Sequence, residues 1–372
     1  MARRTQRFHT VGDGSGVDDT GKFFPEEVAL ALRNKGMPLE GLRYPITPTG
    51  MHYLLVHFDV PEVDTASWRL HIGGLVGKTL SLSLNDLKAR PAVSMPVTME
   101  CAGNGRAQMS PRSISQPWMK GEAIGNAEWT GTPLAPLLTE ARLDSTTIDV
   151  VFTGADRGVQ GDAVQFYQRS LGIAEATRDE VMLAYAMNGR PLEPHHGAPL
   201  RLLVPGWFGM TSVKWLVSIE AIDREFDGYQ QVCAYRYTDD PDDPGEPVSL
   251  IRGRALMAPP GIPDFLTRTR LVEAGSVTLA GRAWAGRSDI LRVEVSADDG
   301  ATWHEARLGE RVGEYSWREW SWEWEARPGP HTLCVRATDA EGNVQPDSQW
   351  NLQGVGNNMA QRVDVIVEEV IG

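Results

Sequence analysis

The sequence predicts an α+β protein of two domains, a mixed α/β domain over residues 1–245 and an immunoglobulin-like β-sandwich over residues 246–372. Three observations favour this fold class. Residues 239–247 read DDPDDPGEP, a run of Asp and Pro that is compatible with neither a helix nor a strand and is typical of a linker. Apolar segments of strand and helix type alternate before it, and short alternating runs separated by turn residues follow it.

The first domain contains segments of both kinds. Residues 67–73 (SWRLHIG) and 148–154 (IDVVFTG) are predicted strands, and residues 134–141 (LAPLLTEA) are a predicted short helix. The irregular spacing and the many loops argue against the regular strand and helix repeat of a doubly wound sheet.

The second domain has the spacing of a β-sandwich. Its predicted strands are residues 276–283, 290–296, 316–325 and 331–338, and Asp298-Asp299-Gly300 is a hairpin turn signal between two of them. Trp320, Trp322 and Trp324 share one face of the third strand. This pattern indicates a sandwich core, or a sheet face covered by another subunit, rather than a platform for stacking a ligand.

Composition excludes several classes of function. The chain has 372 residues, and its 49 acidic against 36 basic side chains give a net charge of −13, which argues against a protein that binds nucleic acid. No apolar run is long enough to span a membrane. The N-terminal MARRTQRFHTVGDGSGVDD contains no apolar export segment, which predicts a cytoplasmic protein, with a mature periplasmic form as the alternative.

The number and spacing of the cysteines exclude several kinds of cofactor and disulfide site. Cys101, Cys233 and Cys334 form no CxxC, no CxxCH and no zinc-like group. We therefore expect no covalently attached haem, no zinc finger and no disulfide framework.

Residues 97–106, VTMECAGNGR, contain the first candidate site. A strand-like run ends abruptly in residues that permit tight turns, so Cys101 is expected at a strand end facing a loop. Arg106 would favour the thiolate, which is the nucleophilic and metal-binding form. The alternative is a small buried cysteine beside a turn.

The second candidate site lies in residues 195–216, HHGAPLRLLVPGWFGMTSVKWL. They group His196, Arg201 and Lys214 around two turns, and the backbone amides of Gly206 and Gly209 together with the two cations would suit an anion such as phosphate. The alternative is a solvated turn with incidental charges. Neither GxGxxG after a strand nor GxxxxGK[ST] is present, so the nucleotide-binding motifs fail.

Several motifs in order resemble the sulfite oxidase family of molybdopterin-dependent oxidoreductases. They are CAGNGR, AIGNAEWTGTPL, LAYAMNG, HGAPLRLLVPG and SVKWL, followed after the linker by VEVSADDGATWHEARL, ATDAEGNVQP and WNLQGVGNN. The likeness spans about residues 40–367. It implies a molybdopterin-binding catalytic domain over residues 1–245 and an immunoglobulin-like dimerisation domain over residues 246–372.

The resemblance also implies roles for individual residues. Cys101 matches the cysteine whose thiolate ligates molybdenum, as expected for a soft donor. Tyr235, Arg106, His57 and Trp118 match residues of the substrate pocket. The positions that match residues holding the pterin and its phosphate are Asp156, His196, Arg201, Ser212, Val213 and Lys214.

Two positions depart from the family pattern. Leu55 and Gln353 stand where the family has arginines of the anion pocket, unless a shifted alignment lets Arg362 replace the second. Two lost charge-assisted contacts would sum to ~3–6 kcal/mol, or about 10²- to 10⁴-fold in affinity for a small dianion.

The resemblance implies oxygen-atom transfer, most simply the oxidation of sulfite or a related sulfur compound by a homodimer. The cofactor would be molybdenum-molybdopterin without haem, and an external carrier such as a cytochrome would accept the electrons. One alternative is a reductase of an S-oxide or N-oxide, for which a less cationic pocket is suited. Two others are a non-catalytic scaffold of the same fold, and a thiol hydrolase using Cys101 with His57 or His196 as base.

Overall fold

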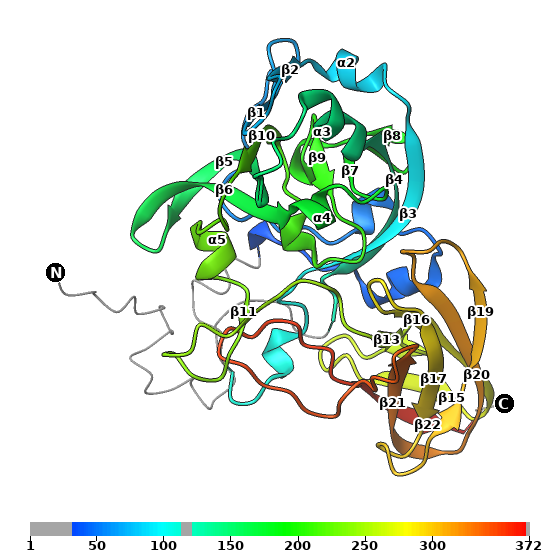
Figure 1. Ribbon diagram of the computed structural model, residues 1–372. Helices are drawn as coiled ribbons and strands as arrows, with labels where there is room; N and C mark the ends of the chain where they lie inside the picture. Colours follow the sequence, from blue (N-terminus) through cyan, green and yellow to red (C-terminus); the bar gives the residue numbers. More distant parts are fainter. Residues whose placement is uncertain (1–31, 113–120, 370–372) are drawn as a thin grey trace.

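The computed structural model describes residues 32–112 and 121–369 and places four larger β-sheets in two groups (Figure 1). Two sheets and the short helices are built from residues before the Asp/Pro-rich segment, and two further sheets follow it. The predicted fold class is therefore confirmed. The division between the domains at residue 245 stays a prediction.

The first sheet has five strands and one parallel pair, β1 with β10. In order across the sheet they are β2 (Leu80–Leu82), β1 (Leu70–Gly74), β10 (Leu216–Ile222), β5 (Asp149–Gln160) and β6 (Ala163–Gly172). Alternation buries Leu70 and Ile72 on one face, where they meet Leu137 and Leu138 of α3 (Ala135–Ala141) in one apolar core. The two predicted strands and the helix of this domain are present, and β5 continues beyond the predicted end through a bulge.

The second sheet supplies the strand end of interest. Its strands are β3 (Val93–Glu100), β4 (Ile124–Pro133), β7 (Met182–Met187) and β8 (Arg190–Pro191), with β9 (Arg201–Leu203) also paired to β7. The other helices among the described residues are α2 (Leu84–Lys88), α4 (Ile173–Ala176) and α5 (Tyr229–Val232). The 3₁₀ turns in the same ranges are η1 (Leu39–Arg43), η2 (Thr49–Met51), η3 (Arg106–Gln108), η4 (Pro194–His196) and η5 (Gly209–Thr211). Short helices and long connections leave many side chains at strand ends, where sites are commonly built.

The later sheets form the predicted sandwich. One contains β13 (Arg254–Met257), β16 (Gly275–Trp284), β20 (Arg318–Ala326) and β19 (Arg307–Arg311). The other contains β14 (Ile262–Pro263), β15 (Arg270–Glu273), β22 (Gln361–Glu368), β21 (Gly329–Asp339), β17 (Ile290–Ser296) and β18 (His304–Glu305). Each sequence-predicted strand of this domain is found within two residues of its expected bounds.

The tryptophan strand forms part of the sandwich core. Trp320 and Trp324 are buried there, and Trp322 is half-buried against the same core. The core interpretation of this strand is therefore confirmed. The predicted turn is also present, since Asp299 and Gly300 have positive φ, but it leads into the short strand β18 rather than into one of the predicted strands.

The Asp/Pro-rich segment is mostly exposed, as its composition predicts. Only its end, β12 (Glu246–Pro247), joins a two-stranded ladder with β11 (Arg236–Tyr237). Among the residues that the structure describes, no helix has the length and apolar content needed to cross a bilayer.

An apolar cluster joins the two groups of sheets. Met37, Ile124 and Met210 pack there with Leu256 and Trp284 from the sandwich side. A buried ion pair lies beside it: Arg254 donates to Glu100 Oε1 at 2.9 Å, and Trp284 Nε1 donates to Oε2 at 2.8 Å. Both charged side chains are at most 2% exposed.

We predict that this ion pair dominates the stability of the contact between the two groups of sheets. Arg254→Met leaves the Glu100 carboxylate buried without its counter-charge, and the cost of breaking such a pair is about 3–5 kcal/mol. Urea unfolding should show this loss, and the double variant Glu100→Gln, Arg254→Met should recover most of it because neither charge remains. Arg33→Met, which breaks an exposed pair with Asp59, is the control. A midpoint for Arg254→Met equal to that of the control would contradict the prediction.

Candidate active site

Cys101 lies directly after β3, at the start of a tight turn. Its N–H donates to the carbonyl of Ala123 at 2.9 Å, and Asn104 Oδ1 accepts from the Ala123 N–H at 2.9 Å. Gly105 adopts φ 70°, a backbone conformation that favours glycine. The strand-end position expected for Cys101 is therefore the observed one.

The Cys101 thiol is buried, and burial raises its pKa. The charge of Arg106 acts in the opposite direction but offsets only part of this rise. The expectation that Arg106 would favour the thiolate is thus right in sign, while the net direction is set by desolvation. Such a thiol is held in its neutral form until a metal ion or another strong electrophile displaces the proton.

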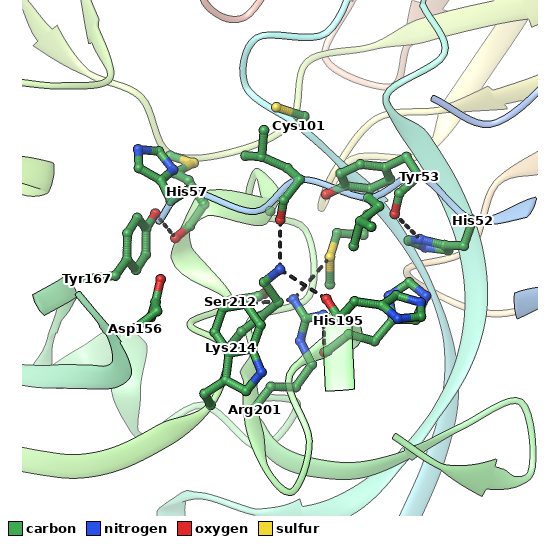
Figure 2. Close-up of a pocket in the computed structure, with 17 residues that line it drawn as sticks. His52, Tyr53, His57, Cys101, Asp156, Tyr167, His195, Arg201, Ser212 and Lys214 are labelled. Atoms are coloured by element: carbon green, nitrogen blue, oxygen red, sulfur yellow. Dashed lines mark hydrogen bonds between the residues drawn. The ribbon is translucent and has the colours of Figure 1, made fainter. Parts of the chain in front are cut away.

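Cys101 lines a pocket with about 640 Å³ of space not filled by protein atoms, part of it open to solvent (Figure 2). The pocket collects side chains from several elements that are distant in the sequence: the segment before β1, the end of β3, β5, η4, β9 and the turn after η5. Of the residues predicted from the sequence, it is lined by His57, Cys101, Asp156, His196, Arg201, Ser212 and Lys214.

Two cations lie in the wall of this pocket and are held by backbone carbonyls. Arg201 donates to the carbonyls of His196 at 3.1 Å and Ser212 at 3.0 Å. Lys214 Nζ donates to the carbonyls of Leu55 at 2.7 Å and His195 at 3.1 Å (Figure 2). Burial lowers the pKa of Arg201 to about 10, and burial together with the Arg201 charge lowers the pKa of Lys214 to about 7. Both cations would be stabilised by an anion in the pocket.

The histidines of the pocket are neutral. Burial lowers the pKa of His196 to about 2 and those of His52 and His57 to about 4. Buried polar atoms without a hydrogen-bond partner gather here: Nε2 of His196, Nε of Arg201 and Oδ1 of Asp156. Such atoms are rare in folded proteins because each costs about 1–3 kcal/mol. Their convergence on one pocket indicates a polar ligand.

Other predicted residues adjoin the pocket without lining it. The charge of Arg106 acts on the Cys101 thiol, and the Tyr235 ring lies 6.4 Å from the His57 ring between centroids. Val213 precedes Lys214, and its carbonyl accepts from the Leu202 N–H at 2.8 Å. Trp118 lies outside the described residues.

The two positions that depart from the family pattern differ in their surroundings. Leu55 lines the pocket. Gln353 instead hydrogen-bonds the backbone on both sides of Tyr235, at Cys233 and Arg236. Arg362 pairs with Asp299 at 3.0 Å and lines a separate pocket, so it does not replace an arginine of this one.

Several lining residues were missed by the sequence analysis, among them His52, Tyr53, Met99, Tyr167 and Met210. Tyr167 projects from β6, and its hydroxyl donates to the Met210 carbonyl at 2.7 Å. The sequence pattern of β6 predicts a strand, but it does not show that the strand borders this pocket. His52 directly follows η2 and is joined to the predicted His57 by an irregular stretch, and only the fold shows that both line one pocket.

Comparison with known proteins gives consistent matches. Residues 57–230 match the oxidoreductase molybdopterin binding domain, and residues 263–368 match the Mo-co oxidoreductase dimerisation domain. The chain is 36% identical over 342 residues to mitochondrial sulfite oxidase of Mus musculus, with 87% of this chain and 62% of the relative covered. It is 35% identical over 330 residues to sulfite oxidase of Gallus gallus, with 83% of this chain and 71% of the relative covered.

A solved structure is similar along nearly the whole chain. The sulfane dehydrogenase SoxCD from Paracoccus pantotrophus superimposes with a TM-score of 0.76 at 25% identity, covering 95% of each chain. The chain spans about 62% of the length of the mouse relative, so the latter contains sequence with no counterpart in this match.

We predict that Lys214 destabilises the protein when it is prepared without molybdopterin. The folded-state pKa of about 7 lies below the ordinary 10.5, so the unfolded chain binds more protons between these values and stability rises with pH across this window. Lys214→Met should therefore raise Tm at pH 6, with a smaller gain at pH 9, in thermal scans. Lys88→Met, at an exposed position, is the control. An equal gain at both pH values would contradict the assignment.

Proposed function

Because the chain belongs to the sulfite oxidase family of molybdopterin-dependent oxidoreductases, we propose that it oxidises sulfite or a related sulfur compound by oxygen-atom transfer. The similarity to a sulfane dehydrogenase supports the wider class of sulfur substrates. The balanced reaction for sulfite is SO₃²⁻ + H₂O → SO₄²⁻ + 2H⁺ + 2e⁻, so an electron acceptor is required.

One observation carries the proposal: a buried thiol and two desolvated cations share a pocket with buried polar atoms that have no partner. Cys101 offers the soft donor that molybdenum accepts from proteins. Arg201 and Lys214 suit a phosphate, and His196 Nε2 and Asp156 Oδ1 offer hydrogen bonds to a polar ring. This set of donors fits a molybdopterin better than it fits a purely apolar ligand.

In this proposal the cofactor-binding residues are Asp156, His196, Arg201, Ser212, Val213 and Lys214, and Cys101 is the metal ligand. When bound, the molybdenum-molybdopterin group supplies the redox chemistry. Arg201 would hold the group from a fixed position, since its guanidinium donates to two carbonyls and lies 4.9 Å from the centroid of the Trp129 ring.

Arg106, Tyr235, His57 and Trp118 are proposed for the substrate side of the pocket. Arg106 supplies a positive charge for an oxyanion. Burial raises the pKa of Tyr235, so its hydroxyl keeps its proton and can donate a hydrogen bond. His57 is neutral for the same reason and presents a donor or an acceptor according to its tautomer.

The proposed function also implies two kinds of protein partner. We expect an external electron carrier such as a cytochrome, and a homodimer formed through the second domain, which the match to a dimerisation domain supports. Ile262, Phe265 and Leu266 are large apolar side chains exposed in this domain, as expected for residues that meet a partner.

One alternative function has a specific observation in its favour. Leu55 makes the pocket wall apolar where the family pattern has an arginine, which suits reduction of a neutral S-oxide or N-oxide. A reduced dye oxidised in the presence of such an oxide, without response to sulfite, would support this alternative. The non-catalytic scaffold makes the opposite prediction, namely no molybdenum in the purified protein.

We predict about one molybdenum per chain after expression in a host that makes molybdopterin. Cys101→Ser should abolish sulfite-dependent reduction of ferricyanide while leaving Tm unchanged, because serine has the same shape but is a harder donor. Cys334→Ser, at a buried site in the sandwich, is the matched control and should retain activity. Wild-type protein without molybdenum would refute the proposed function, and an active Cys101→Ser variant would refute the role of the thiol.

We also predict that Leu55→Arg lowers KM for sulfite. The new guanidinium would add one charge-assisted contact of about 1.5–3 kcal/mol, or roughly 10- to 100-fold in affinity. The Lys214 bond to residue 55 involves the backbone carbonyl and survives the substitution. Leu55→Met is the neutral control. An unchanged KM for Leu55→Arg, with normal molybdenum content, would show that this position does not face the substrate.

A further inference from the structure

Gln353 bridges the two ends of the short segment that carries Tyr235. Its Oε1 accepts from the N–H of Arg236 at 3.0 Å, and its Nε2 donates to the carbonyl of Cys233 at 3.0 Å. The two bonds flank Tyr235 on either side, across about 120 residues of sequence. Gln353 itself is half-buried and lies in the connection between β21 and β22.

The backbone of Tyr235 requires such support. It has φ 62°, in the left-handed region that a bulky side chain rarely adopts. This conformation persists only where surrounding contacts impose it. The Tyr235 carbonyl also accepts from the Val248 N–H at 2.9 Å, which adds a further constraint on this backbone.

The ring of Tyr235 is thereby directed toward the proposed substrate pocket. It lies 6.4 Å from the His57 ring, and the guanidinium carbon of buried Arg169 lies 5.8 Å from its centroid. A changed backbone at residue 235 would move the hydroxyl relative to these neighbours.

The segment that carries Gln353 is itself anchored next to Cys101. Gly356 N–H donates to the Ala102 carbonyl at 2.6 Å, and Leu352 N–H donates to the Thr238 carbonyl at 2.8 Å. Asn351 closes the turn through two bonds to Val355. One turn therefore contacts both the cysteine loop and the tyrosine loop.

We propose, on the basis of the proposed function, that Gln353 is a positioning residue that sets the Tyr235 hydroxyl in the substrate pocket from the second domain. An amide fits this place because one partner is an N–H and the other a carbonyl, and the amide offers both an acceptor and a donor. Arginine has donors only, and a carboxylate has acceptors only. In this proposal, glutamine at position 353 supports the backbone around Tyr235, whereas the family's arginine binds the anion.

The first test measures the geometry without the cofactor. Hydrogen–deuterium exchange of the Arg236 amide should accelerate in Gln353→Ala and Gln353→Arg, which lack the acceptor, and stay slow in Gln353→Glu, which keeps it. Gln349→Ala is the matched control, since Gln349 makes the same pair of backbone bonds to Gly356 and Asn358 within the neighbouring segment. Equal exchange in all variants would overturn the proposal, whatever the enzyme's activity.

The second test asks whether Gln353 acts through Tyr235. In the holoenzyme, Gln353→Ala should lower kcat for sulfite about tenfold or more, because small misplacements of a reacting group are costly, with molybdenum content unchanged. In a Tyr235→Phe background the same substitution should have little further effect. An equal loss in both backgrounds would overturn the positioning role. If the wild type itself lacks molybdenum and turnover, the proposed function fails while the exchange test still decides the geometry.

Discussion

The buried Glu100 carboxylate is the interaction on which both the fold and the site depend. It ends β3, immediately before Cys101, and accepts hydrogen bonds from Arg254, Trp284 and Asn104. A buried charge tolerates little displacement from its partners, because each lost hydrogen bond leaves part of its desolvation free energy uncompensated. The position of the cysteine turn is therefore determined by residues of the sandwich as much as by its own sheet. In this sense the turn that carries Cys101 into the pocket is held by both halves of the chain.

The pocket next to that turn has the opposite character, because its charges are only partly compensated. Arg201 and Lys214 donate to backbone carbonyls, and among the described residues no carboxylate pairs with either of them. Burial lowers both pKa values, and the Arg201 charge lowers that of Lys214 further. The nearby histidines are neutral, and several polar atoms lack partners. A protein that only had to fold would gain by neutralising such a cavity. Its retention is explained by an anionic, polar ligand that supplies the missing interactions.

Much of the fold was predictable because its signals are local. Alternating side chains mark the sandwich strands, and the abrupt change after VTMEC places Cys101 at a strand end. The convergence of Tyr167 and His52 on one pocket depends on sheet order, which no local pattern encodes. Glu100 likewise reads as an ordinary strand residue, since its partner Arg254 lies 154 residues away. The residues proposed to bind the cofactor were identified only through the resemblance of several motifs to one family.

The two departures from the family pattern have different physical consequences. Counted as lost charges, Leu55 and Gln353 together would weaken the binding of a dianion by ~3–6 kcal/mol. Leu55 lines the pocket, so replacing an arginine there removes one contact to the proposed substrate. Gln353 does not line the pocket, and its amide hydrogen-bonds two backbone groups instead. Only one missing contact then bears on the substrate, and the deficit falls to about 1.5–3 kcal/mol, or roughly 10- to 100-fold in affinity. Arg106 remains as a cation beside Cys101, so a pocket with fewer arginines is still compatible with a small sulfur oxyanion.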